Sequence, residues 1–313
     1  MGPSGAGLTS LLMCLNGMNN RRLGAKTRIR LSRDHKIRSA FIGHNEKDFL
    51  VMGLTAKQNM IYASRLKNSD LGPEGQAFDH QMNVSAIMAD LLMSDTMNTR
   101  ADRCSGGEQK RLAIAVELTA FHKPNLILFD EPTTGLDSNV AEVVIQCIKS
   151  LAQKHNICII ATIHQPNSDV LQMFDNLYVL AKGGQCVYFG PPVHLRHHLS
   201  SSNIVCNENQ VPIEHLLTIA SKGMEDTDVV QLRERTIQSV NQLIQSKTNE
   251  TIDKQIQPKS KRFLFKDVFV LTQRWITEFY SYRWRIYLLN MTVLVLGATT
   301  LALNDFCSKM CLS

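Results

Sequence analysis

A glycine-rich run at the start of the chain has the residue types of a phosphate-binding loop. Residues 2–9 read GPSGAGLT and match the pattern G-x-x-x-x-G-K-[ST] except at Leu8, which stands where the pattern has lysine. The backbone N–H groups of such a turn cradle an anion at the start of a helix, and the Thr9 hydroxyl would bind Mg²⁺. Leu8 brings no positive charge to the phosphates. By itself the run fits a nucleotide site and a ligand-free glycine-rich segment equally well.

Two acidic residues at the end of an apolar run suggest metal binding and base catalysis. Asp130 and Glu131 follow the run LILF at 126–129 and precede Pro132, an arrangement of the Walker B type. A short apolar run of this kind predicts a buried parallel strand. Asp130 would hold Mg²⁺ through water, and Glu131 would orient and polarise an attacking water. The alternative is an acidic strand end that faces solvent.

Three further segments carry groups suited to phosphate. The Ser-Gly-Gly of 105–107 is predicted to open a helix with free N–H groups and a hydroxyl, although Ser105 could equally be an ordinary cap. Asp137 lies between the Walker B run and the next helix, for which Ser138 is the predicted cap. His164 ends a second apolar run at 157–163 and could reach a γ-phosphate, although a histidine at a strand end is more often a polar exit from the core.

The elements that must position these residues alternate between strand and helix. A buried strand at 126–129, an amphipathic helix beginning near 138 and a second buried strand at 157–163 predict a βαβ unit. Two β-prone runs flank Gly183-Gly184 and predict an antiparallel hairpin. We therefore expect an α/β nucleotide-binding domain over residues 1–200.

Composition restricts the function classes only weakly. The 313 residues leave room for about two domains, and the net charge of +6 suits nucleic acid, a membrane surface, a phosphate ligand or simply a solvated excess of lysine and arginine. The eight cysteines form no C-x-x-C pair, so a reducing cytosolic compartment and no metal-binding cysteine cluster are expected for residues 1–260. The first twenty residues lack the pattern of a signal peptide.

The last third of the chain changes character twice. Residues 201–260 are polar and are predicted to be a linker with a possible helix at 227–245. Residues 261–284 mix aromatic and basic residues in a predicted amphipathic connecting helix. Residues 285–304 are the predicted transmembrane helix, because 286–304 carry no charge and would span about 28 Å. A buried soluble helix is the alternative. Basic residues precede the span, which predicts a single-pass membrane protein with its N-terminal side in the cytosol.

Taken in order, the motifs resemble the ATPase domain of ABC transporters. The Ser-Gly-Gly-Glu of 105–108, residues 126–132, residues 135–137 and His164 are similar to the signature, Walker B, D-loop and H-loop of that family. The segments SGGEQKRLAIAVEL, LFDEPTTGLDS and TIHQPNSDVLQMFDNLYVLAKGGQCVYFGPP resemble the G subfamily, the White-like half-transporters. The resemblance implies a P-loop NTPase fold with a helical signature subdomain, ATP and Mg²⁺ as ligands, and a head-to-tail dimer of two such domains.

The resemblance also assigns roles to residues of this chain. Glu131 and His164 are the expected catalytic residues, Thr9 and Asp130 the expected Mg²⁺ ligands, and Asp137 the D-loop residue. The site of a partner chain would be completed by Ser105, Gly106, Gly107 and Glu108. The expected nucleotide-binding residues are Gly2, Pro3, Ser4, Gly5, Ala6, Gly7, Leu8, Thr9, Ser10 and His44.

The chain departs from the family pattern in three respects. Leu8 replaces the Walker A lysine, and His44 falls where the family has the Q-loop glutamine. The chain also begins at the P-loop and ends after one predicted membrane helix where the family has six, so the resemblance predicts truncation at both ends. Loss of the lysine charge from a largely dry site should cost several kcal/mol, so ATP hydrolysis is expected by resemblance but weakened.

Two function classes follow. The first is the ATP-binding subunit of a G-type half-transporter, which forms a homo- or heterodimer in membrane lipid and couples ATP hydrolysis to transport of a lipophilic or small organic substrate. The second is a degenerate, non-catalytic protein that pairs with an intact half-transporter and regulates or completes its ATP site. A soluble ABC ATPase acting on DNA or ribosomes is disfavoured by the membrane-like segment 262–304, and no nucleic-acid partner is expected.

Overall fold

The computed structural model describes residues 1–18, 30–32, 37–71, 78–164, 168–207, 209–247, 251–253 and 265–280. The predicted transmembrane helix at 285–304 lies outside these residues. Within the described ranges, none of the helices combines the length and the apolar character that crossing a bilayer requires.

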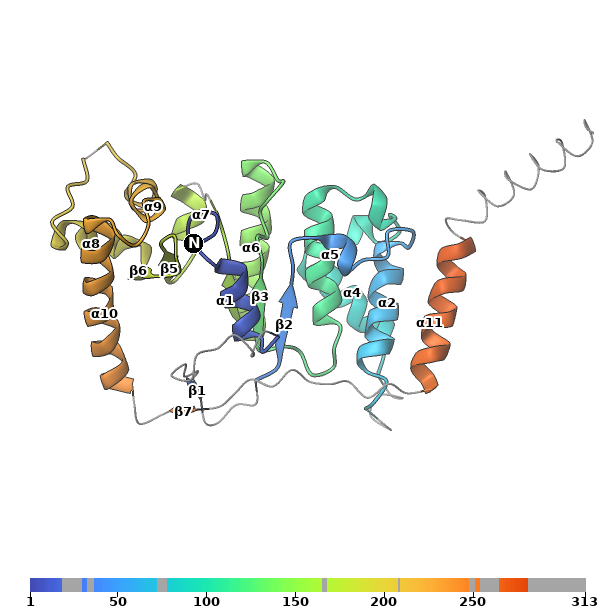
Figure 1. Cartoon of the computed structure of the whole chain (residues 1–313). Helices are drawn as coiled ribbons and strands as arrows, with labels where there is room; N and C mark the ends of the chain where they lie inside the picture. Colours follow the sequence, from blue (N-terminus) through green and yellow to red (C-terminus); the bar gives the residue numbers. More distant parts are fainter. Residues whose placement is uncertain are drawn as a thin grey trace, which may run out of the picture.

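A parallel sheet of three short strands lies at the centre of the fold (Figure 1). Its strands are β2 (Ser39–Ile42), β3 (Leu126–Phe129) and β4 (Cys158–Ala161), with Ser39 opposite Leu126 and Leu126 opposite Cys158. The middle strand β3 is apolar throughout and buried at Ile127, Leu128 and Phe129. Because all three strands are parallel, the residues that follow them meet at one edge of the sheet, the usual place for a ligand in open α/β sheets.

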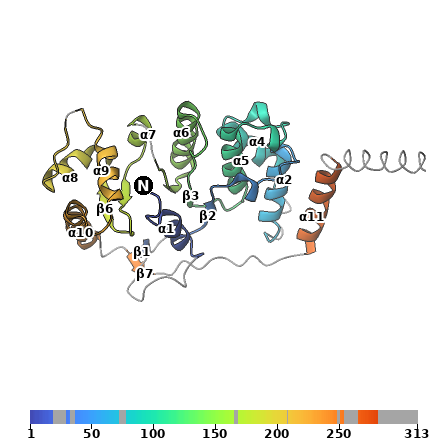
Figure 2. The ribbon, with the colours of Figure 1, turned by 45° about the horizontal axis from the view of Figure 1, so that its top comes forward.

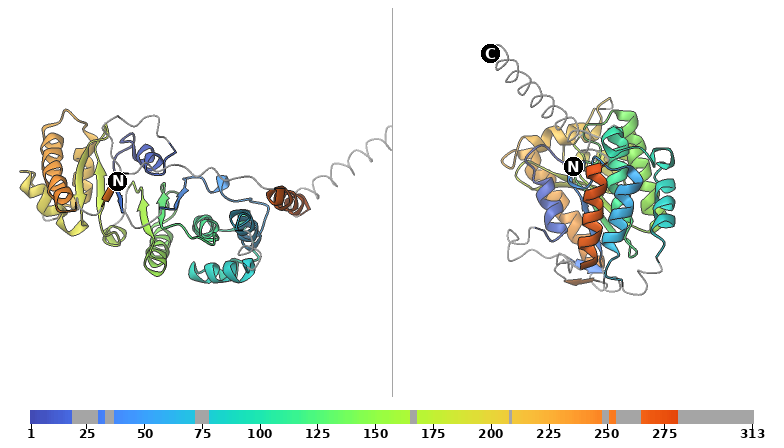
Figure 3. Two further views of the ribbon diagram at one scale, coloured as in Figure 1. Left: turned by 90° about the horizontal axis from the view of Figure 1, so that it is seen from below. Right: turned by 90° about the vertical axis from the view of Figure 1, so that its right-hand side faces the viewer.

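Helices lie on both faces of this sheet. The strand β4 at its edge was predicted to be buried, but it leaves Cys158 and Ile160 exposed. Figure 3 (left) shows α1 (Leu8–Leu15) on one face and α6 (Ser138–His155) on the other. Helix α6 joins β3 to β4, as the βαβ pattern predicted, and buries Val144 and Ile148 against the core. The predicted cap at Ser138 is wrong, because Asp137 is the N-cap and its carboxylate accepts the N–H groups of Asn139 and Val140.

A helical subdomain occupies one end of the molecule (Figure 2). It contains α2 (Ala56–Lys67), α4 (His80–Asp90) and α5 (Gly106–Leu118), with the short helices η2 (Glu46–Asp48), η3 (Ser94–Thr96) and η4 (Ala101–Arg103). A capping box begins α2, since Thr55 and Gln58 each bond the other's backbone N–H. Fully buried Met60, Met88 and Leu112 pack the three helices together. The subdomain therefore has its own apolar interior, continuous with the main core.

Asp90 ties this subdomain to the C-terminal end of α6. Its carboxylate accepts a hydrogen bond from Lys154 at 2.5 Å and lies 3.3 Å from His155 Nε2. Burial by itself would raise the pKa of Asp90, but the hydrogen bonds and charges of Lys154 and His155 outweigh it and hold that pKa below its ordinary value. A carboxyl with a lowered pKa stabilises the fold above its unfolded pKa and loses that contribution as pH falls through the folded value.

Replacing Asp90 with asparagine is expected to lower the free energy of unfolding by about 0.5–1 kcal/mol at pH 7, because Lys154 is largely solvated. The difference between wild type and variant should shrink as pH falls below about 3.9, the ordinary aspartate value. Urea unfolding between pH 7 and pH 3 measures it. Asp95→Asn, at an exposed carboxylate of η3, is the control and should show no such pH dependence. An Asp90→Asn deficit that persists at pH 3 would contradict this account.

The opposite end of the molecule is a hairpin covered by helices. The antiparallel strands β5 (Leu177–Leu180) and β6 (Cys186–Gly190) form the predicted hairpin. Around it lie α7 (Ser168–Gln172), η5 (Pro192–His194), α8 (Leu195–Ser201), α9 (Pro212–Ser221) and α10 (Thr227–Lys247). The remaining strands, β1 (Arg30–Ser32) and β7 (Thr251–Asp253), pair with each other in an antiparallel ladder.

A polar linker was predicted over 201–260, but the structure has the helices α9 and α10 there. The second of them lies where the sequence had allowed a possible helix at 227–245. Ile213, Leu216 and Ile219 of α9 are buried in the main core, and so are Val229 and Leu232 of α10. Their spacing is helical, but the surrounding Gln, Ser, Thr and Lys residues dilute the apolar signal. A few well-spaced apolar residues are enough to dock a helix when one side of it meets a preformed core.

Helix α11 (Phe265–Glu278) lies alongside α2, within the range 261–284 for which a connecting helix was predicted. Tyr62 Oη and Thr277 Oγ1 are 2.7 Å apart, and Arg65 donates to Gln273 Oε1 at 3.1 Å. Two hydrogen bonds therefore join α11 to α2. The exposed side of α11 is apolar and aromatic, with side chains that include Val268, Phe269, Leu271, Trp275 and Ile276.

Candidate functional site

The glycine-rich run forms a tight turn that ends at the N-terminus of α1. Gly5 and Gly7 have φ values of 80° and 89°, a region that side chains with a Cβ rarely adopt. The Ala6 N–H donates to the Pro3 carbonyl at 3.1 Å, which closes the turn, and Gly7 is the N-cap of α1. The first N–H groups of a helix have no intrahelical partner, so this turn presents donors suited to an anion.

Leu8 faces an apolar cluster beside this turn. It is 9% exposed and packs with Ala6 and with Leu180, the last residue of β5, while Leu11 and Cys186 border the cluster. The side chain at the lysine position therefore contributes to the packing of α1 against the hairpin. It supplies no charge to the mouth of the turn.

Asp130 links the turn to the carboxyl ends of β3 and β4. Thr9 Oγ1 donates to Asp130 Oδ1 at 3.1 Å, and Thr162 Oγ1 donates to the same oxygen at 2.8 Å. Asp130 and Thr162 are buried, at 7% and 4% exposure. Three oxygen-bearing side chains, one from α1 and two from the residues that follow β3 and β4, thus converge at one point, although they are far apart in the sequence.

Glu131 lies next to this point with its carboxylate surrounded by donors. His164 Nε2 is 2.6 Å from Oε1, Thr134 donates to Oε2 at 2.9 Å, and His44 Nδ1 is 3.8 Å from Oε2. The backbone N–H of Glu131 donates to Thr162 Oγ1 at 2.8 Å, and its φ of 55° is unusual for a residue with a side chain. The strained backbone aims the carboxylate toward the two histidines.

The pKa of Glu131 is lowered by these neighbours. Burial alone would raise the pKa, but the hydrogen bonds from Thr134 and His164, together with the charges of His164 and His44, hold it below the ordinary glutamate value. The carboxylate is therefore ionised at neutral pH. An ionised carboxylate beside a histidine can accept a proton or orient a water molecule.

The predicted signature segment begins α5, with Ser105 and Gly106 exposed and Gly107 buried. Ser105 is the N-cap in a capping box: its backbone N–H donates to Glu108 Oε2 at 2.7 Å, and the Glu108 N–H donates back to Ser105 Oγ at 3.3 Å. Asp137 caps the neighbouring helix α6. Among the described residues, no hydrogen bond or ion pair joins the segment 105–108 to the glycine-rich turn.

Gly107 permits the close approach of α5 and α6. A Cβ at Gly107 would lie 2.5 Å from Val140 Cγ1, whereas one at Gly106 would lie 3.1 Å from Leu136 Cδ2, the end of a flexible side chain. Gly107→Ala is expected to lower the free energy of unfolding by about 1–2 kcal/mol, because overpacking outweighs the better helix propensity of alanine. Urea unfolding measures the loss, with Gly106→Ala as the control. Equal stabilities of the two variants would contradict the predicted clash.

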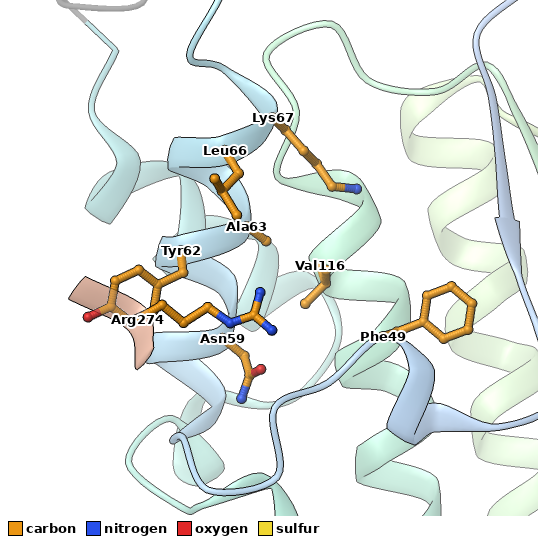
Figure 4. Close-up of a pocket in the computed structure, with 8 residues that line it drawn as sticks. All are labelled: Phe49, Asn59, Tyr62, Ala63, Leu66, Lys67, Val116 and Arg274. Atoms are coloured by element: carbon orange, nitrogen blue, oxygen red, sulfur yellow. The ribbon is translucent and has the colours of Figure 1, made fainter. Parts of the chain in front are cut away.

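A cavity of about 180 Å³ lies elsewhere, against α2, α5 and α11 (Figure 4). Figure 4 shows the guanidinium of Arg274 reaching from α11 toward Val116 of α5. Burial lowers the pKa of Arg274 and outweighs the negative charge of Glu278, which would raise it. The other lining residues are Phe49, Asn59, Tyr62, Ala63, Leu66 and Lys67. None of the predicted nucleotide-site residues lines this cavity.

Sequence reasoning overlooked two threonines of the site. Thr162 bonds Asp130 and the Glu131 backbone, and Thr134 bonds the Glu131 carboxylate. Thr162 lies in the apolar run that was predicted as a strand, and a polar residue at the end of such a run was the available signal. Thr134 lies in the short turn that follows Glu131, where the sequence has no periodic pattern that would indicate its contact with the carboxylate.

Comparison with known proteins defines the class of this fold. The solved structure of cbiO1 from Clostridium perfringens, part of the ABC transporter complex cbiONQ, matches 70% of this chain and 86% of its own with a TM-score of 0.52 at 21% identity. This likeness shows the fold, the P-loop ATPase fold of the ABC type. The family described as ABC transporter matches residues 1–134, and the family described as ABC-2 type transporter matches residues 164–258.

Curated relatives narrow the class to one subfamily. ABC transporter G family member 37 of Arabidopsis thaliana is 31% identical over 91% of this chain and 20% of its own length. Protein white of Ceratitis capitata is 29% identical over 92% of this chain and 43% of its own length. The chain belongs to the ABC transporter family, among the G-type transporters. It spans between about one fifth and about two fifths of the length of these two relatives.

Proposed function

We propose that this chain is the ATP-binding subunit of a G-type ABC transporter and couples ATP binding and hydrolysis to transport of a lipophilic or small organic substrate. The observation that carries the proposal is the cluster in which Thr9, Asp130 and Thr162 meet beside Glu131 and His164. Family membership supports transport, and the relatives named above include a G-family ABC transporter.

The nucleotide phosphates would lie over the glycine-rich turn, at residues Gly2 to Ser10. The free N–H groups at the start of α1 and the partial positive charge of the helix N-terminus favour a phosphate there. His44, which follows β2 at the same sheet edge, would face the terminal phosphate from the other side. These assignments use donors that the turn itself provides, and they do not depend on Leu8.

The residues at Asp130 suit a magnesium ion. Mg²⁺ prefers oxygen ligands and is commonly held by one or two protein groups together with phosphate and water. The Thr9 hydroxyl and the Asp130 carboxylate are 3.1 Å apart and supply such a donor set. They would hold the ion, which when bound neutralises charge on the phosphates. Within the described residues, no cluster of three or more His, Cys, Asp or Glu side chains forms an alternative metal site.

Glu131 would orient the attacking water and accept its proton. Its ionised carboxylate and its short contact with His164 support this role, because His164 holds the carboxylate in one orientation. His164 would also reach the terminal phosphate from the end of β4. The absence of a cation at Leu8 weakens phosphate binding and transition-state stabilisation, so we propose slow turnover at this site.

A second ATPase domain would complete the site. Ser105 and Gly106 are exposed, and among the described residues no hydrogen bond joins the segment 105–108 to the glycine-rich turn, which supports a role opposite the P-loop of a partner. Asp137, at the adjacent helix cap, would lie in the same contact. We propose that the partner is a half-transporter of the same type, either a second copy or a related chain.

Nucleotide binding of the purified full chain tests the proposal. Calorimetric titration should detect MgATP binding, and Thr9→Ala or removal of Mg²⁺ with a chelator should weaken it at least threefold. Thr272→Ala is the matched control, since this exposed threonine of α11 bonds only its own helix among the described residues. MgATP binding that is absent, or equal in all samples, would overturn the assignment of the site.

The burial of Leu8 favours a second candidate. A chain that binds nucleotide poorly but keeps the capped signature segment and Asp137 would pair with an intact half-transporter and complete or block its ATP site. Co-purification from membranes with such a partner, followed by measurement of the partner's ATPase rate, tests this function. A partner rate unchanged by Ser105→Arg in this chain would exclude it.

A further inference from the structure

A buried lysine on the signature helix holds the loop that carries His44. Lys110 lies within α5 and is 7% exposed. Its ammonium forms an ion pair with the Glu46 carboxylate of η2 and donates a hydrogen bond to the His44 carbonyl at 3.2 Å. Lysine is almost never buried without partners. The two contacts therefore fix the place at which the loop after β2 crosses α5.

His44 in turn faces the catalytic carboxylate. Its Nδ1 lies 3.8 Å from Glu131 Oε2, while 59% of its side chain is exposed. So exposed an imidazole has few contacts of its own to hold it, and its position depends on the backbone that carries it. That backbone is fixed by Lys110 from one side and by the pairing of β2 with β3 from the other.

We infer that Lys110 is a positioning residue that holds His44 beside Glu131 and so links the signature helix to the hydrolytic carboxylate of the same chain. The route runs from the exposed start of α5 through Lys110 and the His44 carbonyl to Glu131. A partner that engages the segment 105–108 and shifts α5 would change the surroundings of Glu131. The inference rests on the proposed function only for the catalytic role of Glu131.

The competing explanation is that Lys110 forms an ordinary structural ion pair. The chain offers a matched control in Lys67 of α2, which is 27% exposed. It forms an ion pair at 2.6 Å with Glu117, which lies on α5 as Lys110 does. This second pair also joins α5 to a neighbouring element, but among the described residues it makes no bond to the His44 loop. Loss of either pair leaves an unpaired partner charge, so both substitutions cost stability. Only loss of the Lys110 pair should change the contact between His44 and Glu131.

NMR of the full chain without nucleotide tests the inference. The imidazole resonances of His44, assigned with His44→Gln, should move when Glu131 is replaced with glutamine. We call this shift of the His44 resonances on Glu131→Gln the His44 response. In a Lys110→Met background the His44 response should fall at least fivefold, and amide exchange over residues 44–50 should rise at least tenfold. Lys110→Arg should restore the response, and Lys67→Met should leave it within about a third of wild type. A full response in folded Lys110→Met would overturn the inference.

A milder variant covers the case in which Lys110→Met does not fold. Glu46→Gln removes the ion pair but keeps the lysine and its bond to the His44 carbonyl, and it should reduce the response at least twofold. An undiminished response in Glu46→Gln would overturn the inference as well. MgATP binding of the same samples separates the two proposals: loss of binding with an intact His44 response contradicts the nucleotide site and leaves the role of Lys110 standing.

Discussion

Leu8→Lys is expected to raise the affinity for MgATP, or the rate of its hydrolysis, by about a hundredfold. A preorganised donor aimed at developing charge in a water-poor site is worth a factor of about 10²–10³. The site already has its glycine turn, and Thr9, Asp130, Glu131 and His164 meet at one edge of the sheet. The missing component is a cation at the start of α1.

The substitution also removes a leucine from the cluster with Ala6 and Leu180. Full burial of a leucine is worth about 1.5–3 kcal/mol, and the aliphatic stem of lysine retains part of it. We expect a loss of about 1–2 kcal/mol in the free energy of unfolding alongside the gain in binding. Lower stability together with higher affinity is a combination that improved folding could not produce.

Calorimetric titration measures the affinity for MgATP, and a steady-state phosphate-release assay measures the rate of its hydrolysis. Leu8→Met is the control: it keeps the apolar packing, adds no charge and should bind MgATP as wild type does. A wild-type chain that binds and hydrolyses ATP as well as Leu8→Lys would show that the site does not need a charge at this position. The proposal of slow turnover would then be wrong.

Glu131→Gln is expected to abolish most of the turnover that Leu8→Lys restores. In the Leu8→Lys background the rate should fall about a hundredfold or more, because an amide cannot accept a proton from water. Binding of MgATP should change less than threefold, since Glu131 faces His164 and His44 and is not bonded to the glycine turn. Single-turnover hydrolysis separates chemistry from binding.

Glu142→Gln is the matched control for the loss of one carboxylate. Glu142 lies on the exposed side of α6, where it accepts a hydrogen bond from Gln146 at 3.1 Å. Its substitution should leave both rate and affinity unchanged. A Glu131→Gln chain that keeps a rate within threefold of its parent would show that another group acts as the base, and His164 would be the next candidate to test.

The local pattern predicted the parts of the fold with strong periodicity. The apolar runs at 126–129 and 157–163 correspond to β3 and β4, and the amphipathic helix between them is α6. The glycine turn was predicted from the spacing of its glycines, and the structure gives Gly5 and Gly7 the positive φ values that favour glycine. Helix α9 was missed and α10 was only a possible helix at 227–245, since their buried residues are sparse and become significant only against a core that other segments build.

The sequence by itself determined which residues can do chemistry and at which strand and helix ends they lie, because those ends depend on local periodicity and on glycine. Only the tertiary structure decided that Leu8 packs against Leu180, that Thr162 bonds Asp130, and that Lys110 reaches the His44 loop. Each of these contacts joins residues distant in the chain. They form when parallel strands and their covering helices come together, and no local pattern records which partner a side chain will meet.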